Sequence, residues 1–230
     1  MKRTQTARPP RRIWPWFLAG AAIIAAAVII FIATLRPGTA GQDGTEPAPT
    51  PAPSTTVIAD SEPTGCLGGP ERDATMLLTA QDQAPHTTNG AVEVAAAMVR
   101  WTFRYPGPGS DEATQVAKSL IASTATPEFS DLAAAAAANP NPSRGVVPNG
   151  TPFYLSTVPG VWHVESAEPD RVEVSVGSAY VINGELSPQL RSASTFVLVW
   201  QDGAWKLESG SLSRTTQDLY AIGTTFTGGC

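Results

Sequence analysis

Cysteine and histidine are scarce in this sequence, which has only two of each in 230 residues. Cys66 and Cys230 stand 164 positions apart, and His86 and His163 are also far from each other. A zinc site usually draws four such ligands from short spacings. The scarcity therefore predicts that the protein holds no metal ion.

Motifs of nucleophilic and phosphate-binding enzymes are also missing. The sequence has no G-x-S-x-G elbow and no G-x-G-x-x-G or G-x-x-x-x-G-K-[ST] loop. His163 and Glu165 would share a strand face and could form a proton-handling pair. The alternative is a hydrogen-bonded sheet histidine beside a solvated acid, which we favour because no other group converges on them. We therefore predict no catalytic residue and no cofactor, and a chain that is not an enzyme.

Acidic residues are absent from the first 36 positions, whose charges are all basic. Within this part, residues 13–35 carry no charge, and about 20 apolar residues suffice to cross a bilayer. Trp14 and Trp16 lie at the start of the run, where amphipathic rings prefer the membrane interface. The pattern predicts a basic cytoplasmic tail at 1–12 and an uncleaved transmembrane helix at 13–35. A cleaved signal peptide, with a passable cleavage site at 38–40, is the alternative.

The chain beyond the apolar run divides into a linker and a domain. Residues 36–65 are rich in proline and poor in apolar residues, which predicts an extended stalk or a simple tether. Residues 66–230 are predicted to form one domain outside the cytoplasm. This remainder is acidic, so a nucleic-acid partner is not expected.

The two cysteines mark the two ends of that domain. Thiols outside the cytoplasm tend to oxidise, so we expect a disulfide between Cys66 and Cys230. Closing so long a loop is worth roughly 5 kcal/mol in the idealised entropy model. Pairing between two chains is the alternative.

Inside the domain, the hydrophobic period changes once, from helical to extended. Helical periodicity with capping residues predicts helices at Asn89–Tyr105, Ser110–Ser123 and Thr126–Ala138. Extended patterns follow, and they predict strands at 152–158, 161–168, 171–176, 196–201 and 204–209. Asn183–Gly184 and Asp202–Gly203 are typical two-residue hairpin turns. Helices followed by an antiparallel sheet indicate an α+β fold.

The order of these elements, ending in the W-Q-D-G-A-W-K-L hairpin at 200–207, resembles the cone-shaped fold of the nuclear transport factor family over residues 90–210. Single-pass anchors with such a domain resemble the inner-membrane scaffold subunit of conjugation and type IV secretion machines. They also resemble small membrane proteins of actinobacterial lipid import. The excess of Arg over Lys is typical of a GC-rich, for example actinobacterial, genome.

The resemblance implies a non-enzymatic scaffold or assembly component of a membrane complex for conjugation, secretion or transport. It would contact the bilayer through 13–35, have protein partners, and expose its carboxyl-terminal domain outside the cell membrane. Two other functions stay open: a module that binds a small ligand in the cone, and a small enzyme that uses His163, Glu165 or Tyr180 there. Met98, Trp101 and Tyr105 form a second stripe on the first helix, either as core or as a pocket wall. The candidate residues for a pocket or partner face are Trp101, Tyr105, His163 and Tyr180.

Overall fold

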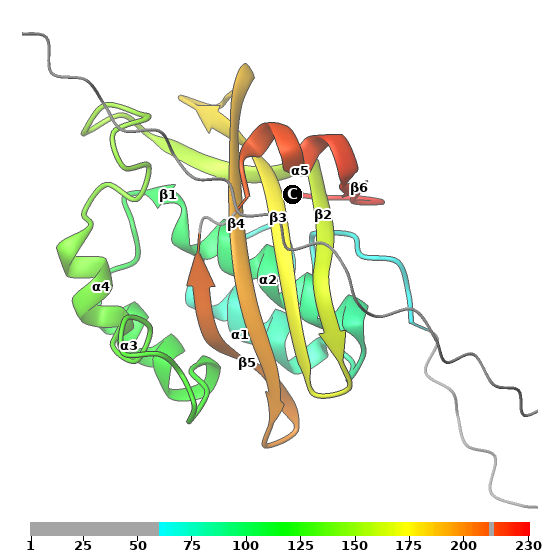
Figure 1. The fold of residues 1–230 in the computed structure, drawn as a ribbon. Helices are drawn as coiled ribbons and strands as arrows, with labels where there is room; N and C mark the ends of the chain where they lie inside the picture. The colour runs from blue at the N-terminus through cyan, green and yellow to red at the C-terminus, as the bar shows by residue number, and fades with distance from the viewer. Residues whose placement is uncertain (1–59, 212–213) are drawn as a thin grey trace, which may run out of the picture. The chain divides into compact units, whose positions relative to one another are not determined.

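The computed structural model describes residues 60–211 and 214–230 (Figure 1). The predicted tail at 1–12, the transmembrane helix at 13–35 and the stalk up to residue 59 lie outside these residues. Among the described residues, no helix has the length and apolar character needed to cross a membrane. By its internal contacts the chain forms two units, with the boundary after Pro53. The unit Ser54–Cys230 contains every described helix and strand and its own hydrophobic core. This unit is therefore a suitable object for binding and unfolding experiments.

Helices come first along the described chain, as predicted. They are α1 (Ala74–Gln83), α2 (Thr88–Thr102), α3 (Ser110–Leu120) and α4 (Leu132–Ala138). The long helix α2 begins at Thr88 because the Thr87 hydroxyl accepts the N–H of Gly90 at 3.1 Å, as an N-cap does. Its residues from Gly90 to Trp101 are all buried, so α2 forms the centre of the core.

The helix predictions need correction. The helix predicted at Asn89–Tyr105 ends at Thr102, and Arg104–Tyr105 pair with a strand of the sheet, so Tyr105 is not on the helix. The helix expected from Thr126 begins only at Leu132, because residues 127–130 form a turn and the Asp131 carboxylate caps the N–H of Ala134. The helix α1 was not predicted, and it begins where the Asp73 carboxylate accepts the N–H of Met76 at 2.9 Å.

The sheet is antiparallel and follows the order of the chain. Its strands are β1 (Arg104–Tyr105), β2 (Phe153–Glu168), β3 (Arg171–Ile182), β4 (Glu185–Gln201) and β5 (Ala204–Ser211), while β6 (Thr224–Thr225) pairs with β2. Both predicted hairpin turns are confirmed, at Asn183–Gly184 and Asp202–Gly203. All four turn residues have positive φ between 52° and 82°, as type I′ turns require.

The strand β2 runs continuously where two strands were predicted. A register shift between Ser156 and Val161 interrupts its pairing with β3. Before the shift, Phe153 and Leu155 face the main core, and after it Trp162 and Val164 do so. The extra residues of the bulge therefore exchange the two faces of the strand, and the sequence pattern is broken at the same point.

Figure 1 shows the layers: α1 and α2 lie behind the curled sheet, α5 (Thr216–Ile222) crosses its front, and α3 and α4 stand beside the β5 edge. Valines of β3, among them Val172, Val174 and Val176, belong to the core shared with α2. The predicted α+β class, with helices packed on a curled antiparallel sheet, is confirmed.

Cys66 and Cys230 form the predicted disulfide, with their Cα atoms 5.3 Å apart. Buried charged side chains of α2 also hold the segment around Cys66, independently of the disulfide. The Glu93 carboxylate accepts backbone N–H groups of Thr64, Gly65 and Leu67.

Arg100 completes this attachment from the same helix. Its guanidinium donates to the carbonyl oxygens of Leu67 and Gly69, both at 2.6 Å. Glu93 and Arg100 are two turns of helix apart and so share one face of α2. The loop that carries Cys66 is thus fixed by two opposite charges as well as by a covalent bond.

Candidate functional site

A cleft of about 860 Å³ opens between the end of α2, the segment around α4 and the strands β4 and β5. Its walls are mostly apolar and include Met98, Trp101, Phe103, Phe129, Leu132 and Phe196. This volume is in the upper part of the range of ligand pockets, which are about 300–1,000 Å³ and are lined mainly by apolar and aromatic side chains. The cleft is therefore large enough to hold a small molecule.

The indole of Trp101 is held in place as one wall of the cleft. Its Nε1–H donates to the Glu112 carboxylate at 2.8 Å. The Arg104 guanidinium binds the same carboxylate through two contacts of 2.6 and 2.7 Å. Since the ring nitrogen is satisfied by α3, the ring presents apolar surface to the cleft.

Small side chains on α4 leave space in the cleft. Ala135 and Ala136 line it, where larger residues would fill it. The preceding turn places Phe129 against Gly210 of β5: a Cβ added at Gly210 would lie 2.9 Å from the ring. The cleft thus depends on alanine on one wall and on glycine on the other.

Aromatic rings continue from the cleft along one edge of the sheet. Tyr105, which lines the cleft, pairs in register with Phe153, and their ring centroids are 6.4 Å apart. The ring of Tyr180 follows at 5.9 Å from Phe153 and is 4% exposed. Burial raises the pKa of the Tyr180 hydroxyl, while a hydrogen bond with Ser192 and the charge of Arg144 act in the opposite direction.

Buried hydroxyl groups without a partner face the same interior. Ser194 is 4% exposed and lines the cleft. It pairs in register with the core residue Val176, so it lies on the inner face of the sheet. Within residues 60–211 and 214–230, neither Ser194 nor Ser178 nor Thr102 has a hydrogen-bond partner for its hydroxyl. An unpaired buried hydroxyl costs about 1–3 kcal/mol. The hydroxyl groups of Thr102 and Ser194, which line the cleft, can therefore gain from binding a polar atom of a ligand.

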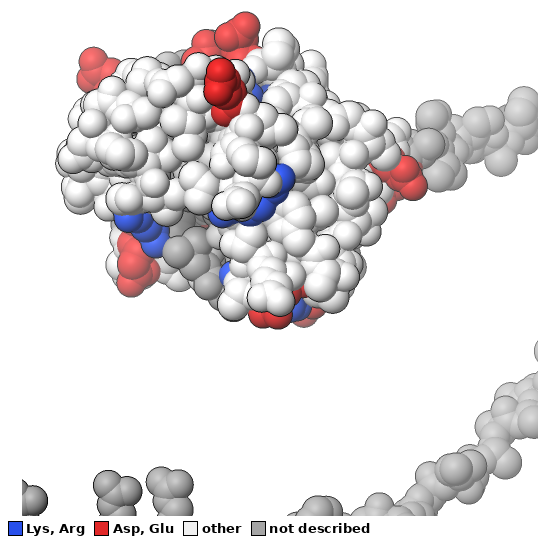
Figure 2. Space-filling model, turned by 90° about the horizontal axis from the view of Figure 1, so that it is seen from above, with Lys and Arg blue, Asp and Glu red and all other residues white. Residues whose placement is uncertain are grey.

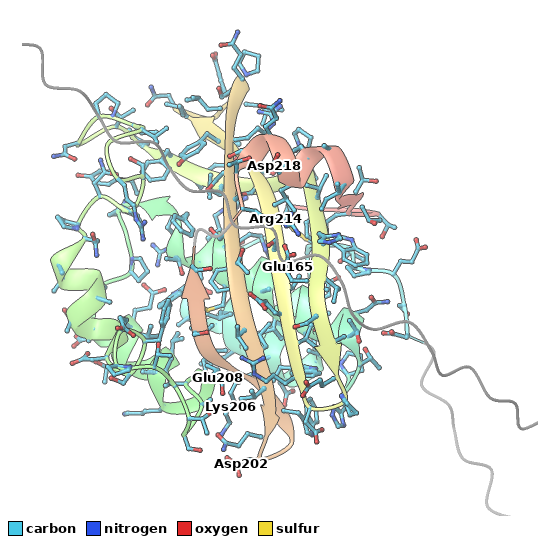
Figure 3. The ribbon with its side chains drawn as sticks, in the orientation of Figure 1. Glu165, Asp202, Lys206, Glu208, Arg214 and Asp218 are labelled. Carbon is cyan, nitrogen blue, oxygen red and sulfur yellow. A yellow bond between two sulfur atoms is a disulfide. The ribbon has the colours of Figure 1, made fainter. Side chains whose placement is uncertain are left out.

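The predicted pair of His163 and Glu165 lies on the opposite face of the sheet. His163 stands between two core-facing residues of β2 and is in register with Ser175. The Ser175 hydroxyl donates to Glu165 at 2.6 Å, and Glu165 also forms an ion pair with Arg214. Figure 3 shows Glu165 and Arg214 close together on the side of α5.

The ion pair explains the electrostatics of this outer cluster. Hydrogen bonding from Arg214 is the main cause that lowers the pKa of Glu165, with a smaller contribution from Ser175. Glu165 is therefore a paired structural acid and not a solvated one. Sequence reasoning did not identify Arg214, because nothing in the local pattern shows that the chain after β5 returns over β2.

The four candidate residues are thus divided by the fold. Trp101 and Tyr105 line the cleft, Tyr180 lies next to it in the core, and His163 is on the other face. His86 is elsewhere again, stacked on Trp200 with ring centroids 4.2 Å apart. In the described parts of the chain, no three His, Cys, Asp or Glu side chains converge as metal ligands would.

Comparison with known proteins assigns no family or function to this chain. Comparison of the sequence with protein-family models, with curated proteins and with solved structures finds no match. The functional proposal for this protein is therefore based on the geometry and the chemistry of the cleft.

Proposed function

We propose that the unit Ser54–Cys230 is a non-enzymatic binding module that holds a small, mostly apolar molecule in its cleft. The observation that carries the proposal is the 860 Å³ cleft with aromatic walls. In this proposal the curled sheet and its helices form the cone that the resemblance to the nuclear transport factor family implies, and the cleft is the interior of that cone.

The chemistry of the cleft lining supports binding more than catalysis. Apolar walls favour transfer of apolar surface out of water by about 25 cal/mol per Å². Of the groups that could handle protons, His163 and Glu165 lie on the outer face of the sheet, and burial raises the pKa of Tyr180 above its ordinary value. Trp101 offers only its ring, because Glu112 occupies its N–H.

A polarity-sensitive dye tests this proposal directly. Nile red, titrated with the unit Ser54–Cys230, should show the saturable blue shift and brightening of a dye in an apolar site. Ala136→Phe fills the cleft from α4 and should weaken binding roughly tenfold or more, which corresponds to about 1.4 kcal/mol. Ala134→Phe is the matched control, since Ala134 is exposed on the same helix and does not line the cleft.

Two results would count against binding in this cleft. The first is a dye that shows no saturable response to the folded unit. The second is equal binding by the Ala136→Phe and Ala134→Phe proteins, which would place the dye elsewhere on the surface.

A scaffold in a membrane complex is the second candidate, and it is compatible with the first. Leu186 and Leu190 support it, because they are 49% and 37% exposed near the start of β4, the strand that projects at the top of Figure 1. Exposed apolar side chains at a projecting edge are suited to contact with a protein partner. In this proposal residues 13–35 anchor the chain in the bilayer and the stalk holds the module outside the cell.

Cross-linking with mass spectrometry in native membranes tests the scaffold role. Cross-links from the β4 end to other proteins should be recovered, and Leu186→Asp should reduce them. Recovery of the chain only as a lone monomer would argue against a scaffold.

A further inference from the structure

A patch of donor groups adjoins the cleft: Arg144 and Ser194 line the cleft, and Ser178, Tyr180 and Ser192 lie beside Ser194 on the inner face of the sheet. We call this patch the hydroxyl end. Resting on the proposed function, we propose that the ligand is an amphiphile with a single carboxylate, whose head group binds at the hydroxyl end and whose apolar body lies along the aromatic walls.

The hydroxyl end is built on two neighbouring strands. Ser178 of β3 is in register with Ser192 of β4. Ser194 lies two residues further along β4 and so points to the same face. Tyr180 lies two residues beyond Ser178 on β3 and reaches Ser192 with its hydroxyl. Four hydroxyl groups are therefore collected on one patch of the inner face, and two of them, those of Ser178 and Ser194, are buried without a partner in the described structure.

A positive charge lies near this patch. Arg144 lines the cleft and is close enough to Tyr180 to influence its hydroxyl electrostatically. The loop that carries Arg144 is held by its own hydrogen bonds: the Asn141 amide donates to Val147 O at 2.8 Å, and the Ser143 hydroxyl accepts the N–H of Val147 at 3.0 Å. Among the described residues, no carboxylate forms an ion pair with Arg144. Its guanidinium is therefore available to an anion.

The charge pattern of the cleft fixes the orientation of the ligand. Glu128 is the acid among the lining residues, and it precedes Phe129, which packs on Gly210 of β5. A carboxylate would be repelled there and attracted to Arg144. Guanidinium and hydroxyl donors together match the acceptor oxygens of a carboxylate.

The surroundings of the site favour an amphiphile over a small polar anion. The walls away from the hydroxyl end are aromatic or aliphatic, such as Trp101, Phe129 and Leu132. On the face of the molecule that Figure 2 shows, uncharged residues cover most of the surface. A fully polar anion would leave the apolar walls in contact with water, whereas an apolar body would cover them.

Competition with Nile red on the unit Ser54–Cys230 tests the head group. The competitors are decanoate, methyl decanoate and decylamine, which share one chain length and differ in charge at pH 7.5. Decanoate should displace the dye at concentrations about tenfold lower than the methyl ester. Arg144→Gln should remove that difference, Arg144→Lys should keep most of it, and Arg171→Gln, which removes a charge already paired with Glu208 on the sheet, should leave it unchanged.

The outcomes separate this inference from the proposed function. If the dye binds in the cleft but the ester competes as well as decanoate, or decylamine competes best, the carboxylate proposal is wrong while the binding module stands. An equal loss of decanoate preference in Arg144→Gln and Arg171→Gln would likewise refute the role of Arg144. If no dye binds to the folded unit, the binding module itself is refuted.

Discussion

Replacement of the buried arginine of α2 should destabilise the unit strongly. Arg100 is fully buried, and its guanidinium donates two hydrogen bonds of 2.6 Å to backbone carbonyls of the loop that carries Cys66. Arg100→Met keeps most of the side-chain volume and removes the charge and both bonds. The free energy of unfolding should fall by about 3 kcal/mol, the scale expected when one partner of a buried charged contact is lost.

That magnitude follows from opposing contributions. Each hydrogen bond to a charged donor contributes about 1.5–3 kcal/mol. Burial, reinforced by the nearby charge of Arg72 and opposed by Glu93, lowers the pKa of Arg100 to about 10, which corresponds to a net cost of about 3 kcal/mol for the charged form in the fold. The two hydrogen bonds together therefore contribute slightly more than this cost. In Arg100→Met, two buried carbonyl oxygens are also left without their donor, which lowers the free energy of unfolding further.

Urea unfolding of the unit Ser54–Cys230, followed by tryptophan fluorescence, measures this loss. Arg191→Met is the matched control, because Arg191 also donates to backbone carbonyls, two at 2.9 Å and one at 3.5 Å, but is half-exposed. The control should change the free energy of unfolding by less than about 1 kcal/mol, because solvated charges contribute little. Equal effects of the two substitutions would refute the reasoning that burial makes the contacts of Arg100 important.

Three further predictions concern the covalent, electrostatic and steric features of the fold. Replacing both cysteines by serine (Cys66→Ser with Cys230→Ser) should lower the free energy of unfolding by about 2–4 kcal/mol, measured in urea against the oxidised wild type. Far-UV circular dichroism should stay native. A loss below about 0.5 kcal/mol would contradict the stabilising role of the disulfide. Glu165→Gln should destabilise the unit at pH 7, and the effect should shrink as the pH falls toward 3. Ion pairing lowers the pKa of this acid below its ordinary 4.5, so the unfolded chain binds more protons and the contribution of the ion pair is lost progressively as the pH falls below 4.5. A difference between the two proteins that stays constant from pH 7 to 3 would contradict that assignment. Gly90→Ala should destabilise the unit by more than about 1 kcal/mol, although alanine favours helix, because its Cβ would lie 2.1 Å from a backbone carbonyl oxygen. Gly109→Ala is the control and should be nearly neutral, because a Cβ there meets nothing within 4 Å. Thermal melts of the two proteins measure the difference.

The parts of the fold that sequence predicts well are those set by local periodicity and turn chemistry. The α2 pattern of small and apolar residues and the two turns with glycine at their second position depend on neighbours in the chain, so the α+β class followed from them. The disulfide was also predictable, because Cys66 and Cys230 are the complete set of cysteines and stand at the two ends of one domain.

The rest depends on contacts between distant residues. The bulge in β2 exchanges the faces of the strand, so the face of His163 could not be deduced from simple alternation. The return of the chain after β5 brings Arg214 to Glu165, 49 positions away, and no local pattern encodes it. The cleft is formed by residues of α2, α4, β4 and β5 together, and of its lining the sequence indicated only the stripe of Met98, Trp101 and Tyr105.

The most direct measurement of the binding function is the indole N–H region of the NMR spectrum during a titration with Nile red. Trp101 lines the cleft, whereas Trp205 lies beside His86 and donates its N–H to Pro85 at 2.9 Å. The proposal predicts a saturable shift of the Trp101 signal and a stationary Trp205 signal in the unit Ser54–Cys230. A shift of the Trp205 signal while the Trp101 signal stays in place would contradict binding in the cleft.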